Sequence, residues 1–239
     1  MYLRVSVLTL TVRESIIATP RAAIVRLDLM HQSFSYHAGQ AAYLNPLGES
    51  RKRPYSIASA PEQTAETGLI EFLIQTDVDG SSGMPKQAIE QGAQISIEGP
   101  VGSFQFPDDP PEHHFLFIAG GTGIAPLRSM LWHALLTGRA GRIGLIYSVR
   151  SPDEFAFLDE FEDLKADGRI GLHHTVTRAA SEDWRGRQGR IDRAYLQPLV
   201  RPGDTLCFVC GPPALVGEMP RLLSELGVSS EQIIVENWG

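Results

Sequence analysis

The chain has 239 residues, of which 43% are hydrophobic and 21% are charged, and its formal net charge at pH 7 is -7. The length allows two packed domains, and the composition is that of an ordinary folded protein. Because phosphate backbones are bound by clustered Lys and Arg side chains, the acidic balance argues against a nucleic-acid partner.

The N-terminal residues 1–8 alternate apolar and polar side chains. They are therefore expected to form a first strand, since a signal peptide has a continuous apolar core. No segment approaches the roughly 20 apolar residues that a membrane-spanning helix needs. We expect a cytoplasmic protein without a membrane partner.

Residues 1–106 alternate with a period of two and are interrupted by turns. In residues 23–29 and 70–75 the apolar side chains fall on one face and the charged or polar ones on the other. This pattern predicts an antiparallel β-barrel, with a single helical turn near residues 85–90.

Within this half, the segment RPYSIAS at 53–59 combines a cation, an aromatic ring and a hydroxyl group in an extended stretch. Arg53 can pair with a phosphate, Tyr55 can stack on a flat ring system, and Ser56 can form a hydrogen bond near a reactive nitrogen. The alternative is an edge strand whose Arg and Tyr side chains only face the solvent.

The segment FPDDPPE at 106–112 contains three prolines and three acidic residues. Proline fixes its own backbone and pushes the preceding residue towards an extended conformation, so the segment is typical of a linker. We expect the first domain to cover residues 1–106, the linker 107–113 and the second domain 114–239.

In the second half, apolar strands alternate with segments whose apolar residues recur at helical spacing. This alternation predicts a doubly wound parallel sheet with helices between its strands. Strands are expected at 115–119, 143–149, 172–177, 206–210 and 233–235. Helices are expected at 127–135, 157–164 and 214–226.

Two glycine-containing turns follow buried strands, GGTGIAP at 120–126 and CGPP at 210–213. Glycine lets a backbone approach a pyrophosphate, the following helix offers its free N–H groups, and Pro126 suits a first helical turn. Because ligands bind beyond the carboxyl ends of parallel strands, both turns are expected to line one crevice. The alternative is a pair of turns whose glycines only permit tight packing.

The chain has only two cysteines, Cys207 and Cys210. An iron–sulfur cluster needs four thiolates, so this chain cannot hold one unaided. The two cysteines have the spacing of a redox disulfide, but they end an apolar run, which favours a buried strand over a reactive pair. The adjacent histidines at 113–114 and 173–174 point to opposite faces of a strand, so no metal site is expected.

These motifs, together with ENW at 236–238, resemble those of the ferredoxin-NADP reductase family, in particular the reductase components of bacterial multicomponent oxygenases. The resemblance covers nearly the whole chain. It implies a flavin-binding barrel, a nicotinamide-binding α/β domain, and FAD between them. It further implies hydride transfer from NADH or NADPH to FAD, followed by single-electron transfer to a separate ferredoxin, flavodoxin or oxygenase component.

The resemblance also implies roles for individual residues. Ser56 would lie near flavin N5, Cys210 against nicotinamide C4, and Glu236 near the flavin edge. Ser82, within GSSG at 80–83, takes the place of a second phosphate-binding hydroxyl, although MP at 84–85 replaces the usual aromatic residue and leucine. Trp238 resembles a terminal aromatic residue that covers the flavin, although Gly239 follows it.

The expected catalytic residues are therefore Ser56, Cys210 and Glu236. The expected cofactor-binding residues are Arg53, Pro54, Tyr55, Ser56, Gly80, Ser81, Ser82, Gly120, Gly121, Thr122, Gly123, Pro126, Arg150, Thr177, Arg178, Cys210, Gly211, Pro212 and Trp238. Thr177 and Arg178 occupy the place where NADPH-using relatives bind the 2′-phosphate, and Arg150, Arg185 and Arg187 can add to it. Similar arginines occur in NADH-using relatives, so the preferred nicotinamide stays open.

Two other functions are compatible with the same motifs. The protein could be a flavin reductase that releases free reduced flavin, or a non-catalytic module that senses nicotinamide. Retention of Arg53, Tyr55, Ser56 and the Cys210 turn favours the enzyme, because a sensor does not need the two rings in contact.

Overall fold

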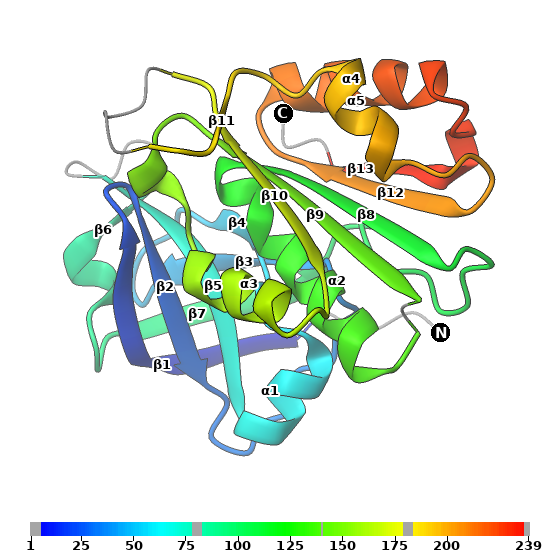
Figure 1. Cartoon of the computed structure of the whole chain (residues 1–239). Coiled ribbons are helices and arrows are strands. Elements are labelled where there is room, and N and C mark those ends of the chain that lie inside the picture. The colour runs from blue at the N-terminus through cyan, green and yellow to red at the C-terminus, as the bar shows by residue number, and fades with distance from the viewer. Residues whose placement is uncertain (1–5, 78–82, 140, 179–183, 237–239) are drawn as a thin grey trace. The chain divides into compact units, whose positions relative to one another are not determined.

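The computed structural model describes residues 6–77, 83–139, 141–178 and 184–236 (Figure 1). The chain divides into two compact units, which we call the barrel unit (Met1–Phe106 with Arg128–Leu136) and the sheet unit (Pro107–Leu127 with Thr137–Gly239). Helix α2 (Ile124–Leu136) therefore begins in the sheet unit and ends in the barrel unit. The boundaries expected from the sequence, 1–106, 107–113 and 114–239, stay a prediction.

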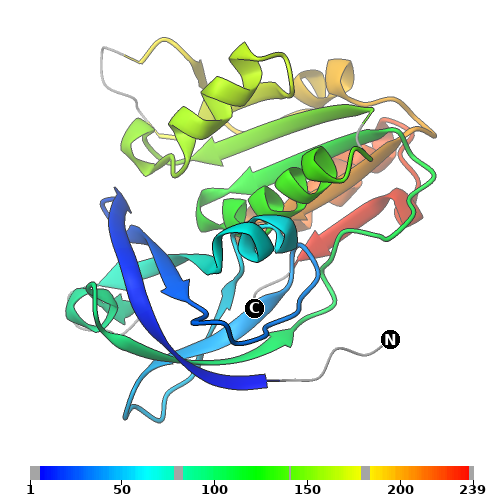
Figure 2. The same ribbon diagram turned by 90° about the horizontal axis from the view of Figure 1, so that it is seen from below.

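The barrel unit is built on one curled sheet with the strand order β4-β3-β7-β1-β2-β5-β6 (Figure 2). Its pairings are antiparallel except for the short parallel pair β5 and β6. Its strands are β1 (Ser6–Thr19), β2 (Ala22–Asp28), β3 (Ala41–Pro46), β4 (Arg53–Ser56), β5 (Leu69–Asp77), β6 (Met84–Pro85) and β7 (Gln94–Val101).

The core of the barrel unit confirms the period-two pattern. Val25 and Leu27 of β2, and Ile70, Phe72 and Ile74 of β5, are all completely buried. Beyond β4, an isolated bridge joins Ile57 to Phe72, so the chain leaving one edge of the sheet reaches β5 near the other edge. This contact curls the sheet.

The expectation of a single helical turn in this half was wrong. A 3₁₀ turn does form at Lys86–Ile89, but a helix also forms at Pro61–Thr67 (α1). Its start is stabilised by Pro61 in the first turn and by the Gln63 side chain, which accepts a hydrogen bond from the Ala60 N–H at 2.9 Å. Seven residues are too few to show helical periodicity, so only these start signals could have revealed it.

The sheet unit contains a six-stranded sheet with the order β11-β10-β9-β8-β12-β13, and every pairing in it is parallel. Its strands are β8 (His114–Gly120), β9 (Arg142–Val149), β10 (Gly171–Val176), β11 (Arg187–Gln188), β12 (Thr205–Cys210) and β13 (Ile233–Glu236). Besides α2, its helices are α3 (Leu158–Ala166), α4 (Arg193–Leu196) and α5 (Pro213–Glu225). The parallel α/β architecture expected from the sequence is confirmed.

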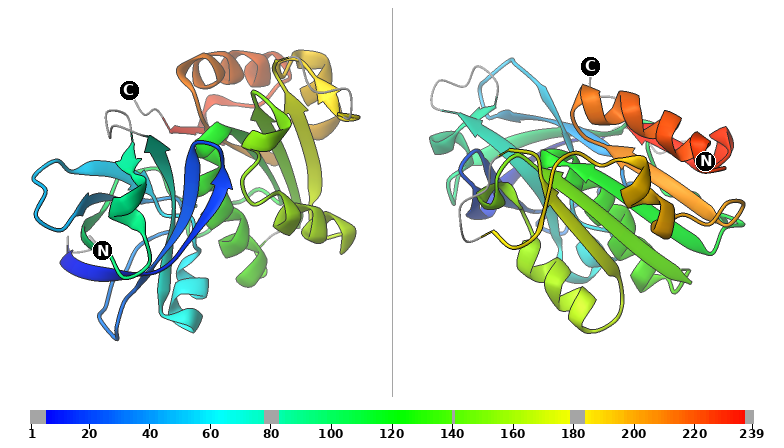
Figure 3. Two further views of the ribbon diagram at one scale, coloured as in Figure 1. Left: turned by 90° about the vertical axis from the view of Figure 1, so that its left-hand side faces the viewer. Right: turned by 45° about the horizontal axis from the view of Figure 1, so that its top comes forward.

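The central strands β8 and β12 are apolar on both faces because both faces are covered. On one face, Ile118 and Val209 pack in a cluster with Leu223 of α5, which lies beside β12 and β13 in Figure 3. On the other face, the neighbouring residues Phe117 of β8 and Phe208 of β12 stack their rings with centroids 5.2 Å apart. Among the described residues, no helix is both long and apolar enough to cross a membrane.

Candidate functional site

The segment RPYS forms β4, the edge strand of the barrel unit. It pairs only with β3 in the sheet order, and Pro54, which has no N–H to donate, suits such an edge. Tyr55 lies opposite Ala42 and Ser56 opposite Ala41. As an edge strand, β4 has a neighbouring strand on one side only in the strand order of this sheet.

The side chains of β4 have the chemistry that a flavin nucleotide requires. The Arg53 side chain is only 12% exposed and lies 3.5 Å from the Glu49 carboxylate, so its guanidinium is held near the strand. Tyr55 packs partly against the barrel core, which orients its ring, and Ser56 is half-buried. A cation, an oriented ring and a hydroxyl thus stand within four residues, and this donor set fits FAD.

The backbone that leaves β4 is anchored by buried polar groups. The Ile57 N–H donates to the Gln40 carbonyl oxygen at 2.9 Å. Tyr36 donates its hydroxyl to the Ser59 carbonyl oxygen at 3.0 Å and lies 2.7 Å from the Thr64 hydroxyl oxygen. Burial raises the pKa of Tyr36 to about 12, so the phenol remains a neutral donor. The sequence motifs did not reveal this cluster; Ser59, the last residue of RPYSIAS, was the available signal.

In the sheet unit, the two glycine turns meet. Gly120 ends β8 and Gly211 follows β12, and a β-carbon added to Gly211 would lie 2.9 Å from the Gly120 Cα. A β-carbon at Gly120 would lie 2.6 Å from Cδ of Pro212. Close approach of the two turns therefore requires glycine at both positions, whether or not a ligand is bound.

Gly121 and Thr122 differ from those packed glycines. Gly121 has φ +55° and an added β-carbon would meet nothing within 4 Å, while the Thr122 side chain is exposed. The turn runs through a 3₁₀ segment, Gly121–Gly123, into the 13-residue helix α2, in which Pro126 lies in the first turn. The first N–H groups of α2 together with the open backbone at Gly121 suit a pyrophosphate.

Cys210 and Glu236 are register partners on the adjacent strands β12 and β13. Cys210 is 1% exposed, and burial raises its pKa well above its ordinary value, with the nearby Glu236 carboxylate adding to the shift. Burial also raises the pKa of Glu236 to about 6. The site thus holds a neutral thiol beside a carboxyl group that takes up a proton under mildly acidic conditions.

Both cysteines are free and buried in β12. Burial raises the pKa of Cys207 to about 12, so neither thiol has the low pKa of a redox disulfide. Within the described ranges, no group of three or more His, Cys, Asp or Glu side chains could hold a metal ion.

The third predicted group lies where β9 and β10 end. Thr177 donates its N–H to the Val149 carbonyl oxygen at 2.9 Å. Arg178 donates its N–H to the Arg150 carbonyl oxygen at 3.0 Å. Both arginine side chains are exposed, so this edge of the sheet carries two cations on neighbouring backbone segments. A phosphate is the natural ligand for such a pair.

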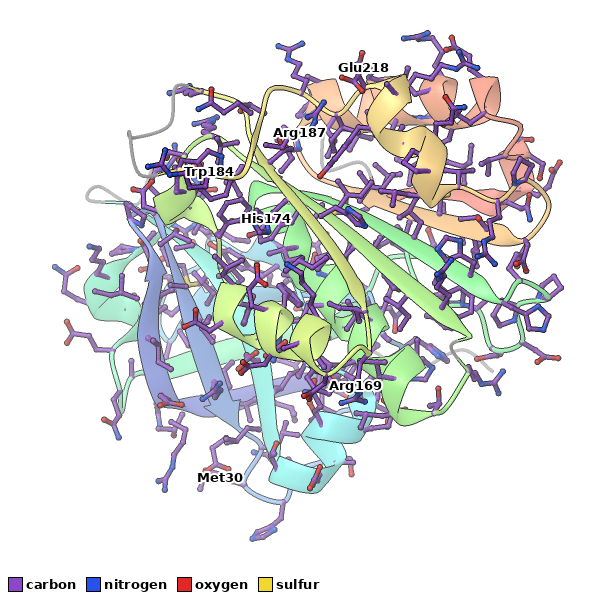
Figure 4. The ribbon with its side chains drawn as sticks, viewed as in Figure 1. Met30, Arg169, His174, Trp184, Arg187 and Glu218 are labelled. Carbon is purple, nitrogen blue, oxygen red and sulfur yellow. The ribbon has the colours of Figure 1, made fainter. Side chains whose placement is uncertain are left out.

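Arg187 on β11 behaves differently from Arg150 and Arg178. Its Nη2 donates to the Asp192 carboxylate at 2.8 Å, its Nη1 donates to the Arg190 carbonyl oxygen at 2.7 Å, and its guanidinium lies 4.2 Å from the centroid of the Tyr195 ring. Trp184, labelled beside it in Figure 4, donates its indole N–H to the Arg187 carbonyl oxygen at 3.2 Å. These contacts give Arg187 a role in ordering β11.

The predicted site residues thus gather in three groups, one at β4 of the barrel unit and two in the sheet unit. The second group comprises the two glycine turns with Cys210 and Glu236, and the third comprises Arg150, Thr177 and Arg178. Gly80, Ser81, Ser82 and Trp238 lie outside the described residues.

Comparison with known protein families matches both halves of the chain. The family described as oxidoreductase FAD-binding domain matches residues 7–106, and that described as oxidoreductase NAD-binding domain matches residues 117–219. The glycine turns lie within the second range and β4 within the first.

Individual relatives match most of the length of the chain. Ferredoxin–NADP reductase B of Sorangium cellulosum is 34% identical over 219 residues, which cover 87% of each chain. One component of the Na(+)-translocating NADH-quinone reductase of Pseudomonas paraeruginosa is 31% identical over 212 residues, covering 82% of this chain and 51% of that component. The chain therefore spans about half the length of the latter type of relative.

Among solved structures, a ferredoxin NADP+ reductase from Neisseria gonorrhoeae with bound FAD and NADP matches with a TM-score of 0.79. The two chains are 22% identical, and the match covers 97% of this chain and 98% of the other. At this identity the match shows a common fold.

Proposed function

Because this chain belongs to the ferredoxin-NADP reductase family of FAD- and NAD(P)-binding oxidoreductases, we propose that it takes a hydride from NAD(P)H and passes single electrons to a separate carrier protein. The observation that carries the proposal is the donor set of β4, in which the guanidinium of Arg53, the ring of Tyr55 and the hydroxyl of Ser56 stand within four residues. Bound FAD supplies the hydride-accepting chemistry and the ability to release electrons one at a time.

On the barrel side, each residue of β4 has a distinct task. Arg53 neutralises a flavin phosphate, and its low exposure limits the side-chain entropy lost on binding. Tyr55 stacks on the flavin ring from a position fixed by the core, and Ser56 offers a hydrogen bond near the flavin N5. The flavin ring is thus oriented before the nicotinamide arrives.

On the sheet side, Gly121, Thr122 and the start of α2 bind the nicotinamide pyrophosphate. Cys210 is neutral because its pKa is raised, so it would contact the nicotinamide ring as a compact, polarizable thiol and would not add to that ring as a nucleophilic thiolate. Glu236, whose pKa is raised to about 6, holds or releases a proton beside it. Hydride transfer itself needs orientation to about 3 to 3.5 Å between the reacting atoms and no catalytic base.

The proposed electron acceptor lies outside the residues of this chain, because an iron–sulfur cluster needs four thiolates and the two cysteines present are both buried in β12. The relative from Sorangium cellulosum is named for ferredoxin, which supports a ferredoxin as the carrier. A flavodoxin or an oxygenase component has matching single-electron chemistry.

Anaerobic rapid mixing tests this function. Purified protein loaded with FAD is mixed with NADH or NADPH, and the flavin absorption is followed; we expect it to bleach with at least one donor. Gel filtration of the loaded protein then separates the two enzymatic modes, since a flavin reductase would lose its flavin on the column. Absence of bleaching with both donors would favour a nicotinamide sensor.

A further inference from the structure

Four charged side chains of alternating sign form a row in the barrel unit. Glu14 of β1 and Arg26 of β2 are register partners, and so are Arg26 and Glu71 of β5. Arg26 Nε lies 2.6 Å from Glu71 Oε2, and Arg128 of α2 places Nη1 2.7 Å from Glu71 Oε1. The row begins at the surface and ends on the helix.

Burial increases sharply along this row. The Glu14 and Arg26 side chains are 47% and 35% exposed, whereas Glu71 and Arg128 are each 6% exposed. A buried ion pair must offset the loss of hydration of both charges, so its presence is weak evidence of a gain in stability. Removal of one member, however, leaves a buried charge without its partner. Pairing with Glu71 therefore does not by itself explain why the Arg128 guanidinium is buried.

Arg128 also holds the backbone that leaves β4. Its Nη1 donates to the Ala58 carbonyl oxygen at 2.8 Å, and the neighbouring Ser129, completely buried, donates its hydroxyl to the Ser59 carbonyl oxygen at 2.7 Å. The Ala58 N–H donates to the Glu71 carbonyl oxygen at 2.7 Å. Both backbone polar groups of Ala58 are thus fixed, two residues beyond Ser56.

This anchor matters because β4 is short and lies at an edge. Its four residues are paired with β3 alone in the sheet order, so its free energy of local opening depends strongly on how the next residues of the chain are held. The residues that face the flavin, Tyr55 and Ser56, are at the end of β4 next to the anchor.

We propose that Arg128 is a positioning residue of the flavin site, whose guanidinium, oriented by Glu71, fixes the Ala58 carbonyl group and thereby holds Tyr55 and Ser56 in the orientation that binds FAD. The inference rests on the proposed function, because it concerns the same flavin site. Ser129 also holds this segment in place, because its hydroxyl donates to the Ser59 carbonyl oxygen.

The test separates the carbonyl contact from the charge of Arg128. Arg128→Met alone would leave Glu71 buried and unpartnered, so the informative variant is the double change Arg128→Met with Glu71→Leu, which removes both charges and keeps an apolar volume. Ser129→Ala removes one anchor without any change of charge. The matched control is Arg26→Met, since Arg26 also pairs with Glu71 but lies in no hydrogen bond to Ala58 or Ser59 among those of the described residues.

Three readouts are taken on each variant: the Kd of the apoprotein for FAD, the visible circular dichroism of the bound FAD, and amide exchange at residues 57 and 58 of the apoprotein. For the double variant we expect a Kd raised about tenfold, because a less preorganised strand binds more weakly, with altered dichroism and faster exchange. For Ser129→Ala we expect the same changes to a smaller degree, with a Kd raised roughly threefold. Arg26→Met keeps its Kd within about twofold of the original protein.

The inference is overturned if the double variant and Ser129→Ala both bind FAD with the original Kd and dichroism, because Arg128 would then only neutralise Glu71. It is also overturned if Arg26→Met loses as much affinity for FAD as the double variant, because the loss would then come from the altered charges of the row and not from the contact with Ala58. Failure of the proposed function is seen separately, in the unsubstituted protein, as a lack of FAD binding or of bleaching by NADH and NADPH.

Discussion

Gly123 and Cys210 are in direct backbone contact: a β-carbon added to Gly123 would lie 2.5 Å from the Cys210 carbonyl oxygen. The contact joins the turn after β8 to the turn after β12, which are neighbouring strands. It therefore sets the distance between the proposed pyrophosphate-binding backbone and the thiol proposed to face the nicotinamide ring.

Replacement of Gly123 by Ala should force these turns apart. We expect a loss of roughly 1 to 3 kcal/mol in the free energy of unfolding and a higher KM for the nicotinamide, because the clash is with backbone and cannot be relieved by a rotamer change. Gly168→Ala, in the turn after α3 and outside the proposed site, is the control, since its β-carbon meets nothing within 4 Å and only the cost of its φ of +70° applies. Thermal unfolding and steady-state kinetics measure both effects; equal behaviour of the two variants would contradict the prediction.

Cys210→Ala should slow hydride transfer with little effect on folding of the barrel unit. We expect the rate of flavin bleaching at saturating nicotinamide to fall about tenfold, or about 1.4 kcal/mol in activation free energy. Cys207→Ala, a change at the other end of the same buried run, should leave that rate unaltered while lowering the melting temperature. A normal bleaching rate in the Cys210 variant would remove this residue from the proposed site.

Much of this architecture was predictable from local pattern. Alternation in β2 and β5, and the apolar runs of β8 and β12, follow directly from which faces are covered, so strands and sheet types could be predicted. Glu71 shows the limit of such reasoning. Its place in the alternation indicates a solvated side chain, yet the side chain is only 6% exposed, because Arg128, far away in the sequence on α2, pairs with it. Local periodicity contains no information on such a partner.

The contact between the two glycine turns is likewise one that local sequence patterns do not predict. The glycines at 120, 123 and 211 are predicted from the sequence to bind a ligand, and the structure adds a packing requirement that acts between turns far apart in the sequence. Only Gly121 and the exposed Thr122 are left with an open face for a pyrophosphate. Sequence motifs locate such a site well but do not distinguish the residues that touch the ligand from those that bring the turns together.

Nicotinamide preference should depend on the two exposed arginines where β9 and β10 end. Arg178→Ala is expected to raise the KM for NADPH about tenfold and to leave that for NADH nearly unchanged, because only NADPH carries the 2′-phosphate. Arg150→Ala should act in the same direction. Arg221→Ala, at an exposed arginine of α5 that belongs to none of the three site groups, serves as the control for loss of positive charge. An unchanged ratio of kcat/KM for the two donors in both variants would disprove the assignment.

Glu236 should impose a pH dependence on stability. Its pKa is raised from 4.5 to about 6 by burial, so between these pH values the folded state binds more protons than the unfolded state. The free energy of unfolding therefore falls as pH rises through this window, and the contribution of the protonated carboxyl group is lost above about pH 6. The Gln side chain of Glu236→Gln does not titrate. The difference in melting temperature, variant minus original protein, should therefore increase as the pH rises from 4.5 to above 6. Melting curves of both proteins across this range test it, and a difference that stays constant with pH would show that the carboxyl group titrates alike in the folded and unfolded states.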